Sequence, residues 1–225
     1  MSIKDVWSRW RDLTRFRLAC EMALSSYRKS FLELPIRVIR GAIIYDERGP
    51  TRFECGYSDF VEVLTEETYL YQLLLTAHAS LVEEFGRTIV ADLLGRGISR
   101  TAFGGLDLAS PVQDAVDIYI MRCNVEAWGG AILGVAGRDW TIVPGGVGDV
   151  VHAFVARNII AHGAKTYNQT AVNRLNGAAP GRFTIVSGTS LVIDRETFQQ
   201  HLSRLRNFAR VICGAPSKVK SAAAA

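Results

Sequence analysis

Apolar residues recur every three or four positions over five stretches of the chain, with polar residues between them. This spacing places the apolar side chains on one face of a helix, so it predicts five amphipathic helices. The predicted helices cover about residues 3–34, 65–95, 110–128, 147–162 and 194–213.

Residues that typically begin and end helices support these boundaries. Pro35 is expected to end the first helix, because a proline disfavours helical backbone in the residue before it. Ser110, Pro111 and Gln113 fit the N-cap, the first helical position and the capping-box position of the third helix. Asp194 is a typical N-cap residue, so the last helix is expected to begin there.

Two segments between the helices favour β-structure. The runs 42–45 and 52–55 flank a turn-like segment, which predicts a small hairpin. A second hairpin is predicted from the runs 183–186 and 191–193, which flank Ser-Gly-Thr-Ser. Residues 168–181 are rich in Asn, Gly and Pro, which predicts an extended polar loop before that hairpin.

Together these elements predict one mainly helical domain, with about five principal helices and one or two small β-hairpins. The domain covers residues 1–216, and 217–225 are expected to be a disordered tail. The chain has 225 residues, of which 48% are hydrophobic and 21% charged, as in ordinary globular proteins. Neither an internal repeat nor a change in composition marks a second domain.

Apolar runs and cysteines bear on location and on metal ions. The longest apolar run, residues 127–137, is about half the length that crosses a membrane, and charges fill the first twenty positions, where a signal peptide would be apolar. A cytoplasmic protein without a membrane partner is therefore expected.

Neither a metal nor a cofactor is expected, because the cysteines lack the close Cys or His neighbours of a zinc site. They are Cys20, Cys55, Cys123 and Cys213.

Charge is distributed unevenly along the chain, although the formal net charge is only +4. Residues 53–92 carry one Lys or Arg against eight Asp or Glu, whereas 151–220 carry ten against two. The C-terminal third is therefore suited to approach by a polyanion. A solvated basic face is the alternative, and charge alone does not decide between them.

The segment from Arg157 to Gly163 combines an arginine, an amide and an imidazole at the end of the fourth predicted helix. Arg offers a fork of donors that suits a phosphate, and His exchanges protons near neutral pH. Asn158 and His162 share one face of a regular helix, whereas Arg157 and His162 diverge by roughly 140°. Arg157 and His162 therefore converge only if the last turn breaks, if the Arg side chain reaches around, or if two copies of the segment meet.

The same segment also fits an ordinary helix end. Basic residues near a helix C-terminus complement the helix dipole, and a glycine such as Gly163 is a common C-cap. On spacing alone, this structural interpretation is favoured.

Arg157-Asn158-x-x-x-His162 resembles the R-x4-6-H motif of HEPN domains, and the resemblance covers about residues 65–165. HEPN domains are small helical bundles, and many are metal-independent endoribonucleases that act as homodimers, including toxins and antiviral defence effectors. The resemblance implies a catalytic role for Arg157, Asn158 and His162. Glu83, on the second predicted helix, matches the acidic position that HEPN domains often carry opposite the motif.

The resemblance implies that RNA is the substrate and that its 2′-hydroxyl attacks the adjacent phosphate. His162 would act as general base or general acid, and Arg157 would hold the phosphate. Asn158 would orient the imidazole or contact the phosphate, and Lys165 and Tyr167 lie near enough to support RNA binding. A regulatory protein partner is a further expectation for a toxin of this kind.

Two other interpretations remain open. In the first, the chain is a noncatalytic HEPN-type module that binds RNA, a nucleotide or a protein. In the second, it is an unrelated helical bundle in which one helix ends in basic residues.

Overall fold

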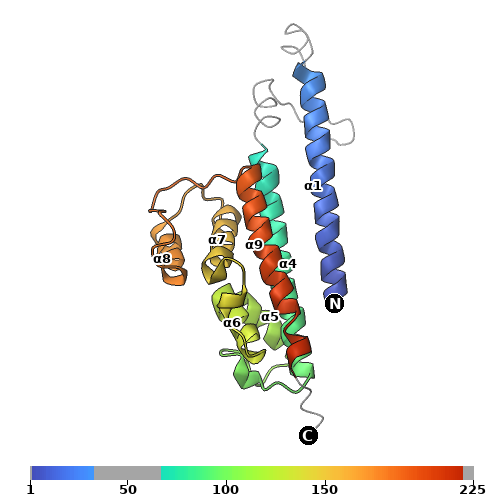
Figure 1. The fold of residues 1–225 in the computed structure, drawn as a ribbon, viewed down its shortest axis with the longest axis vertical. Coiled ribbons are helices and arrows are strands. Elements are labelled where there is room, and N and C mark those ends of the chain that lie inside the picture. Colours follow the sequence, from blue (N-terminus) through green and yellow to red (C-terminus); the bar gives the residue numbers. More distant parts are fainter. Residues whose placement is uncertain (1, 33–66, 220–225) are drawn as a thin grey trace.

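The computed structural model describes residues 2–32 and 67–219, and this part of the chain is almost entirely helical (Figure 1). It contains no β-strand, so the mainly helical prediction is confirmed. The seven α-helices described are α1 (Ile3–Leu32), α4 (Thr68–Gly95), α5 (Val112–Arg122), α6 (Val125–Val135), α7 (Gly146–Ala161), α8 (Gln169–Ala178) and α9 (Arg195–Cys213). Three short 3-10 turns are η1 (Arg100–Ala102), η2 (Trp140–Ile142) and η3 (Pro216–Lys218).

The long helix α4 is the centre of the fold and contacts α1, α5, α6, α7 and α9. Figure 1 shows α4 and α9 side by side, with α1 on one side and α7 on the other. Leu74 and Val90 of α4 lie roughly 160° apart around the helix, and both are buried. A helix that is apolar on more than one face must be enclosed, so its neighbours pack around it. None of the helices described here is long and apolar enough to cross a membrane.

The N-terminal half of α1 packs against α4 through aromatic side chains. Trp10 is buried, and its ring centroid lies 4.7 Å from that of His78. The ring of Trp7 lies 4.7 Å from that of Phe85. These contacts extend the core beyond α4 and α9 to the first helix of the chain.

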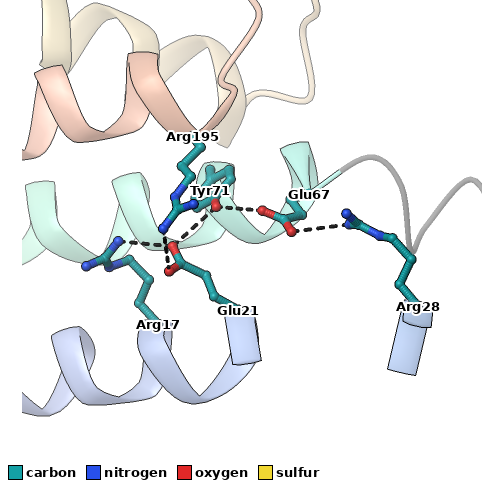
Figure 2. Close-up of polar contacts among 6 residues, drawn as sticks. All are labelled: Arg17, Glu21, Arg28, Glu67, Tyr71 and Arg195. Carbon is teal, nitrogen blue, oxygen red and sulfur yellow. Dashed lines mark hydrogen bonds and ion pairs between the residues drawn. The ribbon is translucent and has the colours of Figure 1, made fainter. Parts of the chain in front are cut away.

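Further along α1, a polar network joins α1, α4 and α9 (Figure 2). Glu21 accepts from Arg17 at 3.0 Å and pairs with Arg195 of α9 at 3.5 Å. The Tyr71 hydroxyl has one proton, which it donates to Glu67 at 2.6 Å. Burial, together with the adjacent carboxylates, raises the pKa of Tyr71. The network is completed by an ion pair of 3.2 Å between Arg28 and Glu67.

The third predicted helix is wrong in two respects. It is broken into α5 and α6 by extended backbone at Cys123 and Asn124. Both halves contact α4, and α6 also packs on α7 and α9. Its start is also misplaced, since the Ser110 hydroxyl bonds the Asp107 carboxylate and Pro111 occupies the cap position before Val112.

The polar loop and the second hairpin are also corrected. Asn168 accepts a hydrogen bond from the Ala171 N–H at 2.8 Å and begins α8, whose Val172 and Leu175 are buried. The run 191–193 does not pair with 183–186. Instead, the Thr189 carbonyl accepts from the Tyr167 N–H at 2.9 Å, and the Leu191 N–H donates to the Lys165 carbonyl at 2.8 Å. The only isolated β-bridge in the described residues is antiparallel and joins Thr166 to Ser190.

Several predictions lie outside the described residues, namely the hairpin at 42–55, the helix end at Pro35 and residues 220–225 of the predicted tail 217–225. The first two residues of that tail, Ser217 and Lys218, lie in the 3-10 turn η3. The starts and ends of α4, α7 and α9 agree with the sequence prediction to within a few residues. The Asp194 cap is confirmed, because its carboxylate accepts from the Thr197 N–H at 2.8 Å.

Gly129 in α6 permits a close approach that a larger residue would block. A Cβ at this position would lie 2.8 Å from both Phe208 Cζ and Trp140 Cη2, and these two rings stack on each other. We therefore expect Gly129→Ala to lower the free energy of unfolding by about 1–3 kcal/mol, measured by urea denaturation. The control is Gly134→Ala on the same helix, where a Cβ meets no atom within 4 Å. This variant should gain about 0.5–1 kcal/mol from helix propensity, and an equal loss in both variants would contradict the packing argument.

Candidate functional site

Helix α7 carries the Arg-Asn-x-x-x-His segment and remains regular to Ala161, with His162 in the C-cap position. Gly163 follows with a φ of 66°, a left-handed conformation that glycine adopts without steric cost. Its N–H bonds the Ile160 carbonyl at 2.9 Å, and the Ala164 N–H bonds the Ile159 carbonyl at 3.0 Å. These are the two bonds of a Schellman motif, so the predicted glycine cap is confirmed and the last turn is intact.

Arg157 is held by groups from two helices. Its Nη2 donates to Glu83 Oε2 on α4 at 3.2 Å, and its Nη1 donates to Asn158 Oδ1 at 2.9 Å. Both ends of the ion pair are mostly buried, with side chains 24% and 19% exposed. Glu84, the neighbouring carboxylate, instead pairs with Arg87 at 3.2 Å. The structure therefore places Glu83 opposite the motif arginine.

The pKa of Glu83 is raised above its ordinary value. Burial raises this pKa more than the positive charges of Arg157 and Arg87 lower it. The Glu83 carboxylate is thus costly to keep charged, and Arg157 is the nearest compensating cation on α7. A guanidinium has five N–H groups, so these two contacts leave Arg157 further donors.

His162 faces a different neighbourhood from Arg157. Its side chain is exposed and lines a cavity of about 240 Å³ between α7 and α8. Asn158 lines the same cavity, as their shared helical face predicts. Arg157 is not among the lining residues. Within one chain, the motif is therefore divided: Asn158 and His162 share the cavity, while Arg157 is directed to Glu83.

The two predicted supporting residues differ in exposure. Lys165 is exposed, and its carbonyl accepts from the Leu191 N–H at 2.8 Å. Tyr167 is only 4% exposed, and its hydroxyl contacts His152 Nε2 at 2.9 Å. Tyr167 therefore anchors the segment after α7 to the interior, whereas Lys165 remains accessible to a ligand.

Behind this segment lies a polar cluster that the sequence analysis did not identify. Arg204 Nη1 lies 3.2 Å from His152 Nδ1. Since Arg only donates, Nδ1 accepts and Nε2 carries the proton that is donated to Tyr167. Asp149 pairs with Arg182 at 3.0 Å and with Arg204 at 3.6 Å. The i, i+3 spacing of Asp149 and His152 was visible in the sequence, but their neighbours on α9 were not.

The cluster holds two neutral imidazoles. Burial, followed by the charge of Arg204, lowers the pKa of His152 to about 4. Burial, followed by His152 and Arg204, lowers the pKa of His201 to about 3. The two rings lie 4.8 Å apart in an edge-to-face arrangement, and His201 is 1% exposed.

A larger cavity, of about 680 Å³, lies elsewhere, between the start of α1, α4 and α5. Its Arg87 is paired with Glu84 and with Asp117 at 3.2 and 3.5 Å. No histidine lines it. The smaller cavity beside His162 is therefore the stronger candidate for proton-transfer chemistry.

Comparison of the chain with models of known protein families, with curated proteins and with solved structures finds no match. Within residues 2–32 and 67–219, no group of three or more His, Cys, Asp or Glu side chains is arranged to hold a metal ion.

The lowered pKa of His152 predicts a pH dependence of stability. Between pH 6.5 and 4 the unfolded chain binds a proton that the folded chain excludes, so the free energy of unfolding falls as the pH falls. For one excluded proton the slope reaches about 1.4 kcal/mol per pH unit. We expect His152→Gln to flatten the slope in urea titrations across this range. The control, His162→Gln, removes an exposed imidazole, and an equal flattening in both variants would contradict the assignment.

Proposed function

We propose that this chain is a metal-independent endoribonuclease with a HEPN-like bundle. The observation that carries the proposal is the exposed His162 imidazole, which lies beside Asn158 on a cavity at the end of α7. Arg157 is on the same last turns and is linked to Asn158 by a hydrogen bond of 2.9 Å. A side chain that can donate hydrogen bonds to a phosphate and a side chain that can transfer protons thus lie at the same helix end.

In the proposed reaction, the 2′-hydroxyl of RNA loses its proton to a general base and its oxygen attacks the adjacent phosphorus. The bond to the 5′-oxygen breaks, and that oxygen takes a proton from a general acid. The products are a 2′,3′-cyclic phosphate and a 5′-hydroxyl. His162 serves as one of the two proton-transfer groups, and Arg157 stabilises the phosphate charge.

A single imidazole cannot readily serve both sides of an in-line displacement. The division of the motif within one chain adds a second requirement, because Arg157 is directed to Glu83 on α4. Both requirements are met if two copies meet across one cleft, each supplying an arginine and a histidine. We therefore include a homodimer in the proposal. A toxin or antiviral role in the cytoplasm, restrained by a protein partner, is the setting that the HEPN resemblance suggests.

A noncatalytic RNA-binding module is the second candidate. It is favoured by the contacts of Arg157 with Glu83 and Asn158, which occupy one N–H on each terminal nitrogen. A binding module can keep these contacts, whereas a catalyst must reorient the remaining donors towards a phosphate.

The test is cleavage of labelled single-stranded RNA in excess EDTA. We expect His162→Ala to lower the cleavage rate by about 10²–10⁴-fold, because it removes a proton-transfer group. Arg157→Lys should lower it by about 10²–10³-fold, because the charge remains but the fork of donors is lost. The control is Arg206→Ala, which removes an exposed cation from α9 and should cleave at nearly the original rate.

RNA that is bound but remains intact would favour the noncatalytic module. Equal cleavage by the original protein and by His162→Ala would remove these residues from the mechanism.

The dimer makes a separate prediction. Light scattering at micromolar concentrations is expected to give twice the mass of one chain, and mixing His162→Ala with Arg157→Lys should restore part of the activity if each copy contributes a different group. A strict monomer that still cleaves RNA would exclude the two-copy arrangement.

A further inference from the structure

We infer that the cavity between α7 and α8 binds the base of an unpaired nucleotide beside His162, and that it favours uracil. This inference rests on the proposed function for its substrate class. At about 240 Å³, the cavity is smaller than the ~300–1,000 Å³ of sites for drug-sized ligands, so it suits one ring rather than a whole nucleotide.

The lining argues against a phosphate as the occupant. Arg174 is the one Lys or Arg side chain among the residues that line this cavity. Its Nε and Nη2 bind both oxygens of Glu126 at 2.8 and 2.7 Å, so its charge is already neutralised. The rest of the wall is neutral. It includes four apolar residues, Val155, Ile159, Ala164 and Ala171.

Two amides in the lining have fixed orientations. Asn158 Oδ1 accepts from Arg157, which has no acceptor, so the oxygen must lie on that side. Asn168 Oδ1 accepts from the Ala171 backbone N–H at the start of α8. In both amides the oxygen is committed to the protein, and the Nδ2 group remains for a ligand.

A ligand that matches these amides must offer acceptors. Uracil carries two carbonyl oxygens that flank its N3–H, whereas adenine has no carbonyl and presents an amino donor beside its ring-nitrogen acceptors N1 and N7. The hydroxyls of Thr166 and Thr170, which also line the cavity, can donate to a carbonyl or accept from the uracil N3–H. Adenine would turn its amino group towards one of the two amide donors, and that amide would then lack an acceptor, which weakens binding.

The cavity is also preorganised. On one side of the cavity, the two hydrogen bonds of the Schellman motif fix the end of α7. On the other side, the Asn168 cap fixes the start of α8. The segment between them is held by the contact of 2.9 Å between Tyr167 and His152. The donors therefore do not need to be ordered when a base enters.

Asn168→Asp is the decisive variant, because it keeps the capping oxygen and replaces the amide donors with an acceptor. Asn173→Asp is its matched control, since Asn173 is exposed on the same helix, accepts from Gln169 through Oδ1 and does not line the cavity. Fluorescence anisotropy would compare labelled deoxyuridine and deoxyadenosine hexamers, which lack the 2′-hydroxyl and cannot be cleaved by the proposed route. We expect roughly tenfold tighter binding of the deoxyuridine hexamer. Asn168→Asp should remove that preference, and Asn173→Asp should retain it.

The outcomes separate this inference from the nuclease proposal. Equal affinity for the two hexamers, or equal effects of the two variants, would overturn the base-binding site even if RNA is cleaved. A preference for deoxyuridine that is lost in Asn168→Asp would support the site even if uridine-containing RNA stays intact.

Discussion

The enclosure of α4 is the constraint on which the other helices depend. Because its apolar residues occupy more than one face, α1, α7 and α9 must surround it, and each polar residue on those faces needs a partner from a neighbour. Glu83 meets this requirement through Arg157 of α7, and Glu67, the N-cap residue of α4, meets it through Arg28 of α1. The candidate arginine is thus positioned by the same packing that stabilises the bundle. A role in stability and a role in chemistry are compatible here, because the guanidinium has more donors than Glu83 and Asn158 use.

The regularity of α7 determines how its polar residues can cooperate. With an intact last turn, residues four apart share a face and residues five apart do not. Asn158 therefore accompanies His162 on the cavity, while Arg157 contacts Glu83. The hydrogen bond between Arg157 and Asn158 links the two sides, so a ligand that pulls on the amide also acts on the arginine. Cooperation of all three on one phosphate then requires either a second copy or a reoriented Arg157 side chain.

Periodicity predicts α1, α4, α7 and α9 because each has a long apolar stripe whose ends carry strong signals, such as Asp194 and Gly163. It does not predict the break at Cys123 and Asn124, since the residues on both sides of the break keep helical spacing. The helix α8 was missed because Asn favours loops as well as caps. In the candidate site, i, i+4 spacing predicts that Asn158 accompanies His162. The His152 cluster depends on Arg204 and His201 of α9, and sequence spacing contains no information about that contact.

Ion pairing lowers the number of cations that the basic C-terminal third can offer to a polyanion. Of its cations, Arg157, Arg174 and Arg195 are paired with carboxylates from earlier in the chain, and Arg182 and Arg204 share Asp149. Carboxylates from outside the basic third therefore pair with five of its ten cations and neutralise much of the charge that the sequence assigns to a polyanion surface. An RNA strand at the end of α7 would meet fewer free charges than the composition indicates, so its affinity would depend less on counterion release. Recognition there must come mainly from placed donors, and Asn158, Asn168 and His162 supply these beside a preformed cavity.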